Sequence, residues 1–317
     1  MIEYMMCYKL MSLIVALMVA TISWGQIWME PLHTTGKTSF AIVADLTTWQ
    51  KCQAEILRYR DVLEAEQLPS YIVADRWKHP EQLREILLKL YNEQHLEGAV
   101  FIGDIPIPMI RKAQHMTSAF KMDEKKYPMI RSSVPSDRFY DDFDLKFDFL
   151  KQDSLNPLMF YYNLSAVSPQ DIRCDIYTGR IKPVISEGLD KYQQIRDYLS
   201  KAVAAHQEAN RLDQFVSYTG EGSYSNSLTA WRAEQQTLRE QLPGVFDRKN
   251  NARFMRYSMW DYPKEEVIAA LQREDLDMLI FHEHGMPYRQ YISATPRTHD
   301  PEEYTEFLKR EFRSKLR

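Results

Sequence analysis

Three apolar runs in the sequence are each followed directly by side chains that can act as acids, bases or ligands. The runs lead into Asp104, into Glu221, and into the two histidines His282 and His284. In an open parallel sheet, ligands bind beyond the carboxyl ends of the strands, so these positions are candidates for a site. A histidine there can serve as a general acid or base, and a carboxylate can orient its ring. The neighbouring N–H of Gly285 could stabilise an oxyanion.

The two histidines leave three interpretations open. His282 and His284 are two residues apart on an expected strand, so their side chains face the same side and could bind a metal ion. The spacing is not that of HExxH, which brings two histidines together on a helix. A histidine satisfied by neighbouring backbone groups is the second interpretation. A general acid–base histidine beside Gly285 is the third.

Acidic side chains gather between two expected elements of the chain. Asp141, Asp142, Asp144 and Asp148 make this segment rich in oxygen ligands. It lacks the glycine and the terminal glutamate of an EF-hand, so we expect a solvated acidic loop. Calcium binding by Asp141, Asp142 and Asp144 is the alternative, and no other cofactor is expected. Asp104 is expected to be a turn or helix-capping residue.

The elements that must position these residues alternate in type. Apolar runs of strand length are separated by segments with helical spacing, which predicts βαβ units and a parallel sheet. Strands are predicted over 39–46, 70–77, 98–104, 173–183, 214–220, 253–260 and 276–285, and helices over 47–67, 79–94, 185–212, 227–242, 263–274 and 301–316. Residues 26–184 are predicted to form a first α/β subdomain with an acidic, loop-rich insertion at 105–170. Residues 185–317 are predicted to form a second α/β subdomain that carries the histidine and glutamate candidates.

Composition excludes several classes of function. The 317 residues carry a net charge of −4, which offers no basic surface for a nucleic-acid backbone. Only 10 residues are glycine, and neither GxGxxG nor GxxxxGK[ST] occurs. Three cysteines, Cys7, Cys52 and Cys174, are too few for a disulfide scaffold and form no zinc-binding spacing.

The N-terminus has the pattern of a secretory signal peptide over residues 1–25. Lys9 precedes an apolar run over 10–22, which is followed by Ser23, Trp24 and Gly25. Thirteen apolar residues are too few to span a bilayer comfortably, so we expect export to the periplasm, cell surface or exterior without a stable membrane anchor. The mature chain would keep two cysteines, which could form one disulfide in an oxidising compartment.

Five segments, taken in chain order, resemble the gingipain-type cysteine peptidases, bacterial relatives of the caspases in clan CD. The resemblance covers about residues 39 to 290. LIFHEHG resembles the strand that carries the family's Gly-His-Gly, with Glu283 in place of the first glycine. The matching segments are FIGDIPIP (101–108), SDRFYDDFD (136–144), DIYTGRI (175–181), SYTGEGSYSN (217–226) and LIFHEHG (279–285).

The resemblance implies a caspase-like, three-layer α/β fold with mostly parallel sheets and two consecutive βαβ subdomains. It implies that His284 is the acid–base residue, that Glu221 orients it, and that the Gly285 N–H forms half of an oxyanion hole. The substrate would be a protein or peptide, cleaved through an acyl-enzyme on a cysteine. Arg232 falls near the position of the family's acidic specificity residue, so no preference for basic side chains is predicted.

The family's nucleophile ends the strand after the helix that follows the histidine. Here that helix is 301–316, and no cysteine follows His284 in the sequence. We therefore expect a second subdomain that lacks its final strand and a chain that is inactive as it stands. Cys52, on a helix face, and Cys174, at the amino end of a strand, are both expected to be buried and inert. The alternatives are an exported pseudoenzyme or peptide-binding module, and a metal-dependent hydrolase that uses His282 and His284. The oligomeric state is left open.

Overall fold

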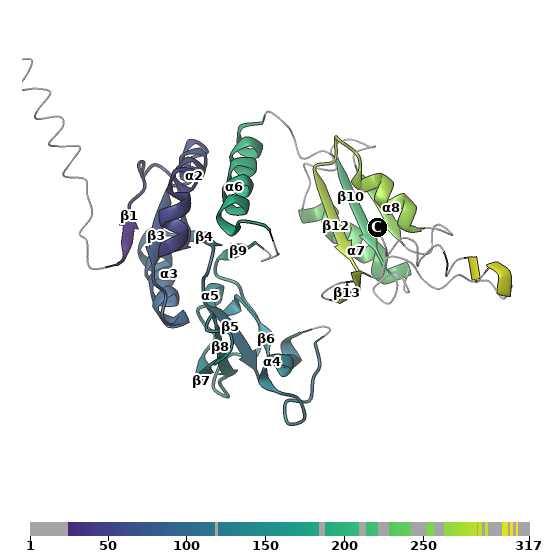
Figure 1. The fold of residues 1–317 in the computed structure, drawn as a ribbon, viewed down its shortest axis with the longest axis horizontal. Helices are drawn as coiled ribbons and strands as arrows, with labels where there is room; N and C mark the ends of the chain where they lie inside the picture. The colour runs from purple at the N-terminus through teal and green to yellow at the C-terminus, as the bar shows by residue number, and fades with distance from the viewer. Residues whose placement is uncertain are drawn as a thin grey trace, which may run out of the picture. The chain divides into compact units, whose positions relative to one another are not determined.

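The chain folds as an α/β protein that divides into two compact units, residues 1–208 and 209–317 (Figure 1). The computed structural model describes residues 25–117, 120–183, 188–208, 214–220, 228–241, 252–256, 263–283, 285–286, 289–290, 300–303, 305–306 and 309. Within these ranges, no helix has both the length and the apolar character that crossing a membrane requires. The predicted α/β class is confirmed.

The first unit is built on a five-stranded sheet, here called the central sheet. Its strands run in the order β1-β3-β2-β4-β9, and β2, β3, β4 and β9 are parallel. The bounds are β1 Ile27–Met29, β2 Ser39–Asp45, β3 Ser70–Asp75, β4 Leu96–Ile102 and β9 Tyr177–Ile181. The predicted strands over 39–46, 70–77, 98–104 and 173–183 are all present. The continuous apolar sequence of β2, β3 and β4 fits a sheet that is covered on both faces.

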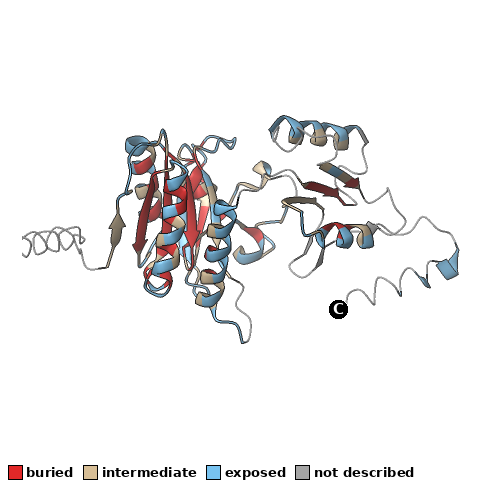
Figure 2. Ribbon diagram, turned by 90° about the horizontal axis from the view of Figure 1, so that it is seen from above, coloured by how far each residue is buried: buried red, intermediate tan, exposed pale blue. Residues whose placement is uncertain are grey.

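Helices cover both faces of the central sheet (Figure 2). Helix α2 (Leu46–Ala65) and helix α6 (Lys191–Gln207) lie side by side on one face, where Ile56, Ile195 and Leu199 are fully buried. Helix α3 (Pro80–Gln94) buries Leu83 and Leu87 on the other face. Helix α6 was predicted to belong to the second subdomain, which was to begin at residue 185. That prediction is wrong, because α6 packs on α2 and belongs to the first unit.

A second sheet of the first unit, here called the insertion sheet, lies in the region that was predicted to be loop-rich. Its order is β6-β5-β8-β7, with β5 and β8 parallel. The elements are β5 Ile107–Arg111, η1 Gln114–Met116, α4 Met129–Ser132, β6 Val134–Pro135, α5 Arg138–Asp141, β7 Phe147–Gln152 and β8 Met159–Leu164. Phe139, Phe160 and Tyr162 pack between this sheet and α3 in one core with the central sheet.

The second unit contains a three-stranded parallel sheet, here called the second-unit sheet, in the order β11-β10-β12. The elements are β10 Phe215–Thr219, α7 Leu228–Gln241, β11 Ala252–Arg256, α8 Pro263–Leu271, β12 Met278–His282, β13 Gly285–Met286 and β14 Arg289–Gln290. Each lies within an element predicted for that part of the chain, apart from β11, which begins one residue before the predicted 253–260, and the short β13–β14 pair. The described residues of 301–309 are helical, as predicted.

Candidate functional site

The carboxyl ends of β10 and β12 lie beside each other in the second-unit sheet. The two strands pair in parallel with Thr219 opposite His282, and the Gly220 N–H donates to the His282 carbonyl oxygen at 2.8 Å. Two of the three polar strand ends that the sequence analysis selected are thus neighbours. Glu221 and His284 themselves lie outside the described residues, whereas Gly285 begins β13.

His282 is held by a carboxylate from another element. Its Nδ1 lies 2.6 Å from Oε1 of Glu234, which is on α7, and the two side chains are 35% and 20% exposed. A carboxylate at Nδ1 fixes the ring orientation and favours the Nδ1–H tautomer. Glu234 was not predicted as a site residue, because Glu234 is 48 residues from His282 and matches no short motif. The β10–α7–β11 crossover, which lays α7 over one face of the sheet, is the one signal that could have indicated it.

Glu283, the next residue, sits in a contrasting environment. Both of its carboxylate oxygens are buried, and they have no hydrogen-bond partner among the described residues. Burial raises the pKa of Glu283 above its usual range. The pKa of the buried Tyr218 is also raised, first by burial and then by the Glu283 charge. Two different carboxyl groups therefore lie near the end of β12: that of Glu234, which pairs with His282, and that of Glu283, which is buried and has a raised pKa.

At the carboxyl edge of the central sheet, the acidic side chains are engaged in hydrogen bonds and ion pairs within the protein. Asp45 caps α2 by accepting the Thr48 N–H at 2.9 Å, and its other oxygen accepts the Asp104 N–H at 2.7 Å. The Asp104 carboxylate pairs with Lys191 at 2.6 Å and with Lys182 at 3.6 Å. Strand order reverses between β2 and β4, where α/β sheets usually bind ligands. Here Asp45 occupies that position, so Asp104 has a structural explanation as an ion-pair partner.

The acidic segment is not the solvated loop that was expected. Asp141 and Asp142 are buried, whereas Asp144 and Asp148 are exposed. One oxygen of Asp141 accepts from the Thr178 hydroxyl at 2.6 Å and pairs with Arg138 at 2.7 Å.

Burial shifts both of these carboxyl groups in the same direction. It raises the pKa of Asp141 to about 6 and raises that of Asp142, which accepts the Arg173 N–H at 2.8 Å. In the described part of the chain, no three His, Cys, Asp or Glu side chains cluster as metal ligands would. Calcium binding here, and metal binding by His282 with His284, stay predictions.

The two described cysteines lie in the first unit, and both are free thiols. Cys52 is fully buried at a kink in α2, and burial raises its pKa, as expected for an inert thiol. Cys174 is exposed and contacts Arg138, so its predicted burial is wrong. The disulfide that these two cysteines could have formed is absent. Cys7 lies outside the described residues.

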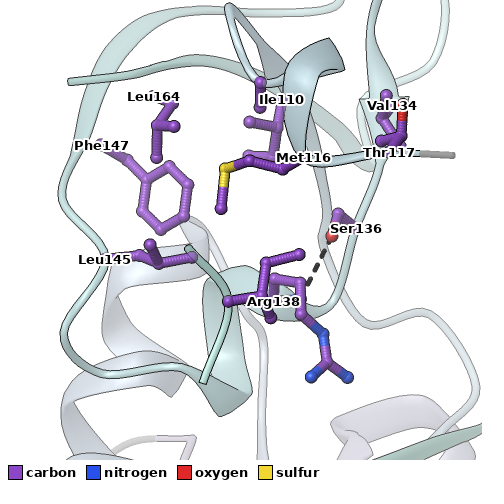
Figure 3. Close-up of a pocket in the computed structure, with 11 residues that line it drawn as sticks. Ile110, Met116, Thr117, Val134, Ser136, Arg138, Leu145, Phe147 and Leu164 are labelled. Atoms are coloured by element: carbon purple, nitrogen blue, oxygen red, sulfur yellow. Dashed lines mark hydrogen bonds between the residues drawn. The ribbon is translucent and has the colours of Figure 1, made fainter. Parts of the chain in front are cut away.

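An apolar pocket opens between the insertion sheet and the segment around η1 (Figure 3). The Arg138 guanidinium turns away from the apolar lining, while the Arg138 N–H donates to the Ser136 hydroxyl at 3.3 Å. The lining residues are Ile110, Ala113, Met116, Thr117, Val134, Ser136, Arg138, Leu145, Phe147, Leu164 and Ile172. Apart from Arg138, this pocket contains no ionisable side chain and therefore no candidate for acid–base chemistry.

Comparison of this chain with protein-family models, with curated proteins and with solved structures found no match. The ends of β10 and β12 bring together a histidine–carboxylate pair and a buried carboxyl group at one sheet edge. Those groups can accept and donate a proton.

Proposed function

We propose that this chain carries the acid–base and oxyanion elements of a gingipain-type cysteine endopeptidase domain with a caspase-like fold. The observation that carries the proposal is the register of β10 with β12, in which Thr219 lies opposite His282. Because these strand ends are neighbours, the proposal expects Glu221 and His284, each two residues beyond its strand, to meet at this edge. That is the arrangement a carboxylate needs in order to orient a catalytic histidine.

In the proposed reaction, a cysteine thiolate attacks the carbonyl carbon of the peptide bond, and His284 donates a proton to the leaving amine. Water then attacks the thioester, gives its proton to His284 and releases the acid and the thiolate. The Gly285 N–H donates to the oxyanion in both steps. Cys52 is buried in the first unit, so we do not assign the nucleophile to it.

The natural gene supplies the test. The coding sequence is determined in independent clones, and the complete gene product is incubated with a peptide library under reducing conditions. We expect peptide cleavage that is abolished by iodoacetamide and by His284→Ala. The variant His206→Ala, in an exposed part of α6, should cleave normally. Cleavage that survives iodoacetamide, or a complete product that cleaves nothing, rejects the proposal.

A second candidate is an exported peptide-binding pseudoenzyme. It is favoured by the location of both described cysteines in the first unit, apart from the unit with the histidines. This candidate predicts a soluble chain that binds peptides without cleaving them. Fluorescence polarisation with a labelled peptide library measures the binding, and thiol-dependent cleavage of the same peptides would exclude this candidate. Export, predicted from residues 1–25, belongs to both proposals and is tested by the N-terminal sequence of the secreted protein.

A further inference from the structure

His282 connects three parts of the second unit. Its main-chain carbonyl accepts the Gly220 N–H at 2.8 Å, which ties the end of β12 to the end of β10. Its ring Nδ1 lies 2.6 Å from the Glu234 carboxylate, which ties the same strand end to α7. Along the chain, Glu283 and His284 follow it directly, and β13 begins at Gly285.

A side chain that fixes the end of a strand also restricts the backbone that leaves it. The main-chain hydrogen bond sets the distance between the two strand ends but does not stop residues beyond His282 from rotating about the strand axis. The Glu234–His282 contact adds a second, off-axis attachment point. With both contacts in place, the last residue of β12 is fixed at two points, its main chain and its ring.

We propose that Glu234 and His282 are a positioning pair that aligns the residues after β12 for catalysis. This inference rests on the proposed peptidase function, in which His284 and the Gly285 N–H act on the substrate. Neither Glu234 nor His282 is a catalytic residue in it. Misalignment of an acid–base group by about 1 Å can reduce a rate by up to about a hundredfold while substrate binding is retained. The pair should therefore affect kcat much more than KM.

The state of the His282 ring gives a readout that does not depend on activity. Nitrogen-15 NMR of the purified chain reports which ring nitrogen carries the proton in the neutral form. We expect the Nδ1–H tautomer in the wild type and in Glu234→Gln, because the amide oxygen still accepts from Nδ1–H. The variant Glu234→Ala should lose this preference and should also exchange the Gly220 amide hydrogen faster.

The matched control is Glu240→Ala, which removes an exposed carboxylate from the same helix, where it accepts from Gln236 at 2.8 Å. This variant should leave both the tautomer and the Gly220 exchange rate unchanged. If Glu234→Ala behaves like Glu240→Ala in both measurements, the pair does not position the end of β12 and the inference is overturned.

The catalytic consequence is measured in the complete gene product. We expect Glu234→Ala to lower kcat about tenfold with KM changed less than twofold. The variant Glu234→Gln should keep most of the wild-type kcat. Equal effects of Glu234→Ala and Glu240→Ala on kcat would contradict the positioning role. If the complete product cleaves no peptide, the proposed function fails, and the NMR and exchange data still decide whether the pair fixes this strand end.

Discussion

The Asp45 carboxylate accepts the main-chain N–H of Asp104, 59 residues further along the chain, at 2.7 Å. Asp45 ends β2 and Asp104 follows β4, so this contact closes the central sheet at the position where strand order reverses. A carboxylate that already caps α2 and binds a neighbouring strand end has little capacity left for a ligand. The proposed site therefore lies at the ends of β10 and β12 and not at this edge.

Replacing Asp45 should destabilise the first unit. Asp45→Ala removes the cap of α2 and leaves the Asp104 N–H without its acceptor, which together should lower the free energy of unfolding by about 2 kcal/mol. Urea unfolding monitored by circular dichroism measures the change. Asp171→Ala, at an exposed carboxylate, is the control and should be neutral within about 0.5 kcal/mol. Equal midpoints and slopes for the two variants would contradict this explanation of Asp45.

Gly103 should not tolerate a side chain. It has φ +85°, and a Cβ atom there would collide with the Asp45 carboxylate and the Thr48 hydroxyl. We expect Gly103→Ala to cost at least about 2 kcal/mol. Gly179→Ala is the matched control, because a Cβ atom on that residue of β9 would meet nothing within 4 Å. Differential scanning calorimetry should show a lower Tm for the first variant alone, and equal Tm values would refute the steric argument.

The buried Asp141 should make stability depend on pH. Its pKa is raised from 3.8 to about 6 because burial disfavours the charged form. Between these two values the folded state retains a proton that the unfolded chain has released, so this group's contribution to stability falls as pH rises from about 4 to about 6. Asp141→Asn removes the titration. Urea unfolding measures the free energy of unfolding at each pH in this range. That free energy should fall less steeply with pH in the variant than in the wild type, and parallel pH profiles would contradict the assignment.

The two cysteines should differ in reactivity. Cys174 is exposed, whereas Cys52 is buried with a raised pKa, so it offers little thiolate. Iodoacetamide should alkylate Cys174 in the native protein, and Cys52 only after urea unfolding. Peptide mass spectrometry identifies the labelled residue, with Cys174→Ser as the control that abolishes native labelling. Labelling of Cys52 at the same rate as Cys174 in the native state would show that α2 opens readily.

Elements with a strong local pattern could be predicted from sequence. The runs that became β2, β3 and β4 are continuously apolar because helices cover both faces of their sheet. The insertion sheet was missed, because β7 is mostly exposed and β5 contains Pro108, so neither shows a clear period. Burial of individual loop residues, and contacts between distant elements, had no local signal at all.

In the candidate site, too, some features could be predicted from local sequence and others could not. That Gly220 and His282 lie at one edge of the sheet could be predicted, since the residues after adjacent parallel strands leave the sheet at the same edge. The Glu234–His282 contact depends on how α7 crosses the sheet, which no spacing in the sequence encodes. Burial of Asp141 likewise depends on Thr178, which lies 37 residues further along the chain.

The packing of α6 on α2 decides where the gene can be divided. A cut between codons 184 and 185 would remove Ile195 and Leu199 from the apolar layer above β2 and β4. The piece 1–184 would then have an uncovered apolar face and poor solubility. A cut after codon 208 keeps the helix pair together on one polypeptide. Each half expressed from that junction would retain the helices that cover its own sheet.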